Sequence, residues 1–250
     1  MTEYKHFRDA FRQVRKKTDE HRMYETGGDW GIQDSALIVD PSKRASGFEH
    51  PYDSEFDFRG MYPEEFTDLK TYLEARLASK PVIGIELGGR ASRLFSQFTP
   101  GFIERSLGVL LSDNRSASHP QQAQDALRHH EVITADVFST EGKQTINKWL
   151  NGQKADLIFE RMEGAISDGP YTEPGFMTAV FTRWYRLLSE RGIMLVQSPW
   201  LDATTLTDME TRLDTLKEQH IDVVYKRRPL GDKARLYTIL EKKAGAPESF

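Results

Sequence analysis

Residues 81–95 read PVIGIELGGRASRLF, and this stretch indicates a strand, a turn and the start of a helix. The apolar run at 82–87 fits a buried strand of a parallel sheet, which is covered on both faces and needs no polar alternation. Gly88 and Gly89 follow, and glycine lets the backbone turn tightly and approach a ligand because it has no Cβ. Open α/β sheets bind ligands beyond the carboxyl ends of their strands, so this turn is a candidate binding site.

Composition limits the class of protein. The 250 residues suffice for one α/β domain with additional segments or for two small domains. The 34 basic and 38 acidic residues give a net charge of −4, which argues against a protein that coats nucleic acid but allows a local basic patch. Without cysteine, neither a disulfide nor a thiolate metal site can form. No long apolar run or apolar signal core is present, so we expect a soluble, cytoplasmic protein.

The chain divides into two parts. Residues 1–78 form an N-terminal segment of helix and loop. Within it, residues 2–24 predict a basic amphipathic helix, and residues 63–78 predict a helix that begins at Pro63. The long loop at 25–62 is rich in aromatic residues, which need burial, so we expect it to be ordered as a substrate lid. The aromatic residues expected in this lid are Trp30, Tyr52, Phe58 and Tyr62.

Residues 79–250 predict a Rossmann-like domain in which strands and helices alternate. We expect strands at 82–87, 108–113, 132–136, 155–160 and 192–197, and helices at 119–130, 142–151, 174–191 and 204–219. Two final strands, 221–226 and 235–240, are joined by a loop too short for a parallel crossover, so they must form an antiparallel hairpin. The predicted fold is a doubly wound, mainly parallel seven-stranded α/β sheet with a C-terminal antiparallel hairpin and helices on both faces.

This order of elements, from Val82 to Lys242, resembles the class I S-adenosylmethionine-dependent methyltransferases, whose seven-stranded sheet ends in such a hairpin. The resemblance implies S-adenosylmethionine as the cofactor. In the family's first motif an acid precedes a Gly-x-Gly-x-Gly turn, and Glu86 and Gly88 match its beginning. Arg90 and Ser92 occupy the later glycine positions, with Gly89 between the expected places. Arg90 is either a partner for the methionine carboxylate or an obstruction to the cofactor.

Two further motifs of the family end the second and third predicted strands. Asp113, followed by Asn114, occupies the place of the acid that accepts hydrogen bonds from the ribose hydroxyls, and a carboxylate only accepts. Asp136 and Val137 occupy the places that contact the adenine. A single acid at a strand end is commonly a helix cap or turn residue. Three such acids at the same edge of a sheet, Glu86, Asp113 and Asp136, favour a nucleoside site.

The loop after the fourth predicted strand faces the methyl donor in this family, which makes Glu160 and Glu163 the candidate catalytic bases. A structural salt bridge with Arg161 or Arg183 is an equal interpretation. Asp156 opens the strand, away from the predicted site, so we interpret it as structural. His129 and His130 are interpreted as cations at the end of a helix, and we expect no metal site.

The predicted function is methyl transfer to an O or N atom of a small-molecule acceptor. One alternative is an RNA methyltransferase that uses two basic regions, with Arg12, Arg15, Lys16 and Lys17 in the first and Lys226, Arg227 and Arg228 in the second. A second alternative is a catalytically inactive relative that binds or scaffolds, as the altered glycine turn suggests. A nicotinamide-dependent oxidoreductase is disfavoured because neither Gly-x-Gly-x-x-Gly nor Tyr-x-x-x-Lys occurs.

Overall fold

The computed structural model describes residues 37–38, 52–62, 64–110, 129–135, 137, 140–161, 176–198 and 200–248. The predicted N-terminal helix at 2–24, most of the loop at 25–62 and most of the predicted helix at 119–130 lie outside these residues. None of the helices in the described ranges combines the length and hydropathy that a membrane span requires.

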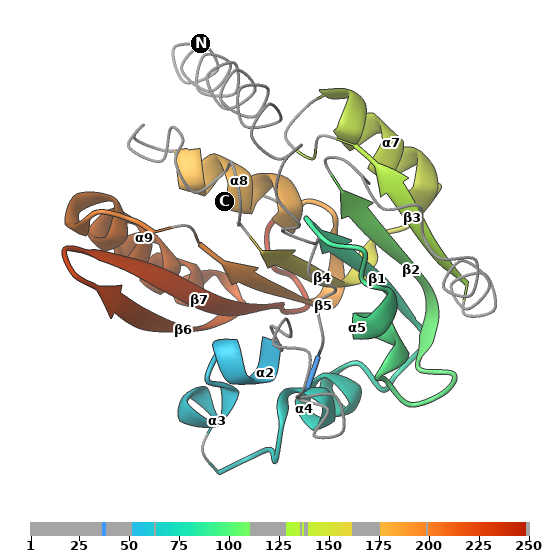
Figure 1. The fold of residues 1–250 in the computed structure, drawn as a ribbon, viewed down its shortest axis with the longest axis horizontal. Coiled ribbons are helices and arrows are strands. Elements are labelled where there is room, and N and C mark those ends of the chain that lie inside the picture. Colours follow the sequence, from blue (N-terminus) through green and yellow to red (C-terminus); the bar gives the residue numbers. More distant parts are fainter. Residues whose placement is uncertain are drawn as a thin grey trace, which may run out of the picture.

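Helices and strands alternate along most of the described chain (Figure 1). The strands are β1 (Val82–Leu87), β2 (Ile103–Leu110), β3 (His130–Thr134), β4 (Ala155–Arg161), β5 (Leu188–Gln197), β6 (Ile221–Leu230) and β7 (Lys233–Lys242). The helices are α2 (Tyr52–Glu55), α3 (Phe58–Met61), α4 (Leu69–Arg76), α5 (Ser92–Ser96), α7 (Thr140–Leu150), α8 (Phe176–Tyr185) and α9 (Ala203–Leu216), which a 3₁₀ turn at Lys217–Gln219 extends.

The strands form one seven-stranded sheet in the order β3-β2-β1-β4-β5-β7-β6. Strands β1 to β5 are parallel, whereas β7 runs antiparallel to both β5 and β6. The predicted mainly parallel sheet with a C-terminal antiparallel hairpin is therefore confirmed. The parallel order places β1 and β4 next to each other at the centre, with their carboxyl ends at the same edge.

The core consists of two clusters of buried side chains, and in β4, β5 and β7 residues on opposite faces of the strand enter different clusters. In β4, for example, Ile158 belongs to the first cluster and Phe159 to the second. This alternation follows from the pleat of a strand, which points successive side chains to opposite faces. The first cluster includes residues of α7, α8 and α9, and the second includes residues of α2, α3, α4 and α5.

Asp156 joins the three central strands near their amino ends. Its buried carboxylate accepts hydrogen bonds from the Ile83 amide on β1, at 3.0 Å, and from the Ser189 hydroxyl on β5, at 2.5 Å. The Lys80 ammonium lies 2.7 Å from the same carboxylate. The interpretation of Asp156 as a structural residue is confirmed by these contacts.

The predicted helix at 174–191 is too long. Helix α8 ends at Tyr185, and residues 188–191 belong to β5. Leu187 and Leu188 continue the apolar spacing of the helix, so the sequence pattern does not show where the helix ends. The sheet decides their conformation, because the Leu187 carbonyl accepts a hydrogen bond from the Ala155 amide and Leu188 pairs with Ala155.

Three other predicted boundaries are wrong. Helix α4 begins at Leu69 and not at Pro63, because the Asp68 side chain caps it by accepting a hydrogen bond from the Thr71 amide at 2.7 Å. Strand β2 starts five residues earlier than predicted, in a polar stretch around Glu104. His130 is the first residue of β3 and not the end of a helix.

The hairpin is longer than predicted. Its strands pair from Ile221 with Lys242 to Leu230 with Lys233, so the predicted loop at 227–234 is mostly ladder. The connection is Gly231-Asp232, and Gly231 has a φ of 61°. The basic residues at 226–228 hide the strand because they do not alternate with apolar ones.

Part of the predicted lid is packed into the core. Tyr52 and Phe58 are fully buried in the second cluster, and the Tyr52 ring lies 4.7 Å from the Phe159 ring of β4. Tyr62 is half-buried against the same cluster, and Trp30 lies outside the described residues. A lid function for residues 1–78 stays a prediction.

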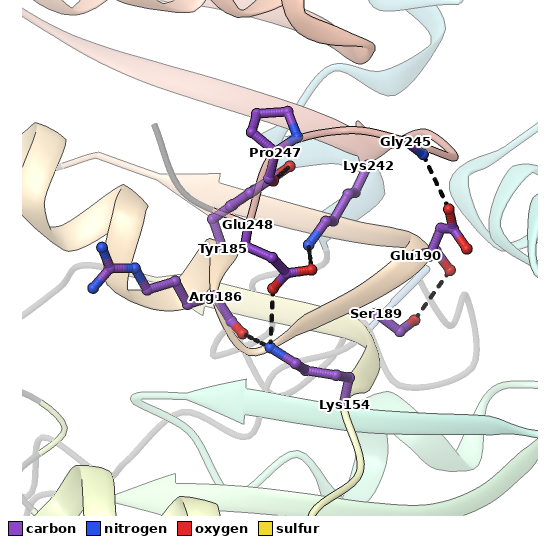
Figure 2. A network of polar contacts seen from close by, with 9 residues as sticks. All are labelled: Lys154, Tyr185, Arg186, Ser189, Glu190, Lys242, Gly245, Pro247 and Glu248. Carbon is purple, nitrogen blue, oxygen red and sulfur yellow. Dashed lines mark hydrogen bonds and ion pairs between the residues drawn. The ribbon is translucent and has the colours of Figure 1, made fainter.

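The chain after β7 is fastened to residues just before β4 and in the first part of β5 (Figure 2). Glu248 accepts hydrogen bonds from Lys242 at 3.1 Å and from Lys154, just before β4, at 3.4 Å. The Tyr185 hydroxyl donates to the Pro247 carbonyl at 2.7 Å, and burial followed by the charge of Glu248 raises the pKa of Tyr185 to about 12. These contacts hold the described part of this segment near the amino ends of β4 and β5.

The Asp156 contacts predict a large stability effect. We expect Asp156→Ala to lower the free energy of unfolding by about 2–4 kcal/mol, because it removes the acceptor of the buried Ile83 amide and leaves the Ser189 hydroxyl only its 3.4 Å contact with the Glu190 carbonyl. Urea unfolding monitored by circular dichroism measures the effect. Asp222→Ala removes an exposed carboxylate from β6 and is the control, with an expected loss below about 1 kcal/mol. Equal losses in the two variants would contradict the structural role of Asp156.

Candidate active site

Two of the predicted functional acids are brought together at the carboxyl ends of the central strands. Glu86 is the penultimate residue of β1, and Glu160 is the penultimate residue of β4. In the β1–β4 ladder Glu86 pairs with Phe159 and Leu87 pairs with Glu160. The two acids are therefore one register step apart, and their side chains leave opposite faces of the sheet.

Glu86 is buried and hydrogen-bonded. The Tyr52 hydroxyl donates to its Oε1 at 3.1 Å, from helix α2. The bond links the N-terminal part of the chain to the end of β1. Sequence reasoning did not find this role for Tyr52, because the two residues are 34 positions apart and no local pattern connects them.

Glu160 is also buried, but it is stabilised differently. Among the described residues, its Oε2 has no hydrogen-bond partner. Burial, followed by the negative charge of Glu86, raises the pKa of Glu160 well above its ordinary value. The shift favours the protonated form of this carboxyl, which must be ionised before it can act as a base.

The turn after β1 lies against the end of β2. The Gly88 amide donates to the Val109 carbonyl at 2.8 Å, and Gly89 forms a bridge with Val109. Gly88 has a φ of 93°, in the region that favours glycine. A Cβ at Gly89 would overlap the carboxylate of Glu86. Gly88 is therefore favoured by the backbone conformation and Gly89 by the position of the Glu86 side chain.

A buried histidine holds the next residue of the turn. The Arg90 carbonyl lies 2.7 Å from His130 Nε2, and His130 Nδ1 lies 2.7 Å from the Ser106 hydroxyl. Since a carbonyl only accepts, Nε2 carries a proton, and a neutral imidazole then accepts from Ser106 through Nδ1. A Cβ at Gly108 would overlap the Arg90 carbonyl, so glycine allows this close approach. Arg90 itself is buried.

The sequence interpretation of His130 as a helix-end cation is wrong. Its partners Ser106 and Arg90 lie 24 and 40 positions away, and β2–β3 pairing brings them together. No local signal in the sequence could have found this contact.

The remaining predicted site residues are only partly covered by the described chain. Asp113, Asn114, Asp136 and Glu163 lie outside it. Val137 is described, and its side chain is buried in the first core cluster. Within the described ranges, no group of three or more potential metal ligands occurs.

Comparisons with known proteins address the fold. The sequence matches no protein-family model, and no curated protein matches it significantly. The N-methyltransferase NodS from Bradyrhizobium japonicum WM9, in complex with S-adenosyl-L-homocysteine, is a structural neighbour with 19% identity and a TM-score of 0.44, covering 82% of this chain and 94% of NodS.

Two other structural neighbours are longer proteins. One, from Streptococcus mutans, is assigned to the S-adenosylmethionine-dependent methyltransferases, with 11% identity and a TM-score of 0.46 over 69% of this chain and 47% of that protein. The other is the MycE methyltransferase of mycinamycin biosynthesis, with 13% identity and a TM-score of 0.42 over 78% of this chain and 49% of MycE. This chain spans about half the length of both.

The seven-stranded sheet, parallel except for its C-terminal antiparallel strands, is the arrangement that the resemblance to class I methyltransferases predicted. At identities below 20%, these similarities concern the fold alone.

His130 provides a test of the turn's support. We expect His130→Leu to lower the free energy of unfolding by about 1–3 kcal/mol for each hydrogen bond that it removes, one to the Arg90 carbonyl and one to the Ser106 hydroxyl. Urea unfolding measures the loss. His129→Asn is the matched control, since His129 is exposed, has a φ of 52°, and asparagine tolerates that conformation. A loss no larger than that of the control would exclude the support role.

Glu160 gives a prediction about pH. The pKa of Glu160 is higher in the folded protein than in the unfolded chain. Below the pKa of the unfolded chain, the protonated side chain contributes fully to stability, and this contribution is lost as the pH rises through the pKa of the folded protein. Glu160→Gln removes this titration. Relative to the unmodified protein, the variant is expected to gain about 1.4 kcal/mol per pH unit above about pH 4.3, until the folded pKa is reached. Denaturant unfolding between pH 5 and 8 measures the difference.

Glu104→Gln, at an exposed position of β2, is the control for this series. A stability difference between Glu160→Gln and the unmodified protein that does not change with pH would contradict the raised pKa of Glu160.

Proposed function

We propose that this protein is an S-adenosylmethionine-dependent methyltransferase, with the nucleoside at the carboxyl ends of β1, β2 and β3 and the methyl donor beside β4. One observation carries the proposal: Glu86 and Glu160 are buried carboxyl groups on adjacent strands at the edge where open α/β sheets bind ligands. A doubly wound arrangement with helices on both faces of the sheet is part of the proposal, and the composition of the two core clusters supports it.

The residues at this edge suit the cofactor. Its sulfonium is a cation, and a cation near Glu160 would lower the raised pKa of that carboxyl and stabilise its ionised form. The unpartnered Oε2 of Glu160 offers an acceptor. Gly88, with a φ of 93°, turns the backbone sharply at the same edge. The residues that we propose to hold the cofactor are Glu86, Gly88, Gly89, Arg90, Asp113, Asn114, Asp136 and Val137.

The chain's own residues would mainly position and shield the acceptor. S-adenosylmethionine supplies an activated methyl group on sulfur. Displacement at that carbon requires alignment of the attacking atom and exclusion of water. An O or N nucleophile of a small-molecule acceptor that carries a proton must lose it, and Glu160 and Glu163 are the proposed bases. Glu160 can serve once it has ionised. The segment 1–78 is proposed to cover the acceptor.

A second candidate function is a catalytically inactive binding protein. The buried Arg90 in a position where the family has glycine supports it, because a long side chain there occupies space beside the turn. The inactive protein would bind the sulfur nucleosides or a partner without transferring a methyl group. Binding and transfer must therefore be measured separately.

Calorimetry with S-adenosylmethionine and S-adenosylhomocysteine tests the cofactor assignment, with NAD as the control ligand. We expect micromolar binding of a sulfur nucleoside, about −8 kcal/mol, and none of NAD. Asp113→Ala is expected to weaken this binding more than about tenfold, since it removes the acceptor for the ribose hydroxyls. Asp222→Ala is the control variant. Unchanged affinity in Asp113→Ala would refute the assignment of Asp113, and absence of binding by the unmodified protein would refute the proposed cofactor.

A further inference from the structure

Glu160 is a buried acid for which the described chain supplies no partner at Oε2. The residue is 1% exposed, and no described residue forms a hydrogen bond with this oxygen. The other buried acids of the two central strands have partners, since Asp156 accepts hydrogen bonds from β1 and β5 and Glu86 accepts one from Tyr52. Burial of a carboxyl oxygen without a hydrogen bond is unfavourable. Packing alone therefore does not account for an acid at this position.

The surroundings of Glu160 disfavour its charged form. Its neighbours in the sheet are Leu87 on β1 and Val196 on β5, and both belong to the first core cluster. Burial and the negative charge of Glu86 both raise the pKa of Glu160. The carboxylate form of this side chain therefore needs a positive charge beside it.

The described part of the chain does not supply that positive charge. Burial and Glu86 are the two causes of the raised pKa of Glu160, so neither Arg90 in the turn after β1 nor Arg183 on α8 offsets it. Glu160 is the penultimate residue of β4, at the edge where open α/β sheets bind ligands. A cation that arrives as part of a ligand would lower the pKa of Glu160 and would itself be stabilised by the carboxylate.

We propose that Glu160 is the residue that distinguishes the positively charged methyl donor from its neutral product. This inference rests on the proposed function. S-adenosylmethionine carries a sulfonium cation, whereas S-adenosylhomocysteine has an uncharged thioether in the same place. A sulfonium beside the carboxylate of Glu160 is stabilised in surroundings that screen charge poorly, and a thioether is not. Glu160 therefore adds to the affinity for the donor and not to the affinity for the product.

The charge of Glu160 changes together with the charge of the cofactor when the methyl group is transferred. An O or N atom of the acceptor forms a bond to the methyl carbon, the carbon–sulfur bond breaks with its electron pair on sulfur, and Glu160 takes the proton that the acceptor loses. The positive charge on sulfur and the negative charge on Glu160 disappear together, so no uncompensated charge is left in the buried site. The product then faces an uncharged acid, which favours its release.

Calorimetric titration of three nucleosides tests this selection by charge. The ligands are S-adenosylmethionine, S-adenosylhomocysteine and sinefungin, in which a carbon that bears an ammonium group replaces the sulfonium. We expect Glu160→Gln to weaken binding of the two cationic ligands about tenfold relative to S-adenosylhomocysteine, because it removes the carboxylate and keeps the size of the side chain. Glu104→Gln, at an exposed position of β2, is the control, with expected changes below about twofold.

The pH dependence of binding is a readout that a merely structural role of Glu160 would not change. A cation that binds the ionised carboxyl displaces a proton, so the affinity for S-adenosylmethionine rises with pH by up to about tenfold per pH unit below the pKa of Glu160 in the free protein. Titrations between pH 5 and 7, in two buffers of different ionisation enthalpy, measure this rise and the proton release. We expect neither effect for S-adenosylhomocysteine, and neither in Glu160→Gln.

The outcomes distinguish this inference from the proposed function. Selective weakening of the two cationic ligands in Glu160→Gln, with loss of the pH dependence, supports the inference. Equal weakening of all three nucleosides, or a preference for the cations that does not change with pH, would overturn the role of Glu160 and leave the proposed cofactor site in place. Absence of binding of all three nucleosides to the unmodified protein would refute the proposed function and this inference together.

Discussion

Three carboxyl groups are buried in the two central strands, and a buried carboxylate without a partner costs several kcal/mol. The structure stabilises each in a different way. Asp156 accepts hydrogen bonds from β1 and β5 and pairs with Lys80. Glu86 accepts a hydrogen bond from Tyr52. Glu160 has its pKa raised, which favours its uncharged, protonated form. Asp156 secures the amino ends of the strands, so the less stable arrangement is confined to their carboxyl ends, where a ligand would bind.

Much of the fold follows from the sequence, because its parallel strands are short apolar runs separated by helical spacing. The run at Val82–Leu87 is a strand with the predicted bounds, and the short connection after β6 correctly requires an antiparallel hairpin. The predicted helix and strand boundaries were wrong where the local sequence pattern disagrees with the pairing of strands in the folded protein. Leu188 continues a helical apolar stripe, yet pairing with Ala155 makes it part of β5. The charged stretch Arg227–Arg228 lacks apolar alternation, yet the ladder with β7 continues through it.

The sequence predicted only those parts of the candidate site whose residues lie close together along the chain. Glu86, the glycine turn and Glu160 adjoin strand ends, and strand ends are visible in the sequence. The contacts that hold the turn depend on residues far apart along the chain, such as Ser106, His130 and Arg90. Their convergence depends on which strands become neighbours, and one sequence does not state the strand order. The protonation of Glu160 depends on burial, which also requires the folded structure.

The hydrogen bond from Tyr52 to Glu86 connects two regions that the sequence separates. Tyr52 belongs to the N-terminal segment, whereas Glu86 belongs to the end of the central strand. Any ligand that changes the charge or the hydrogen bonding of Glu86 must therefore change the free energy with which α2 is held against the sheet. By thermodynamic reciprocity, anything that displaces α2 must change the affinity for that ligand by the same factor. Packing of α2 against the sheet and binding of a ligand at Glu86 are thus thermodynamically coupled, so a measurement of one reports on the other.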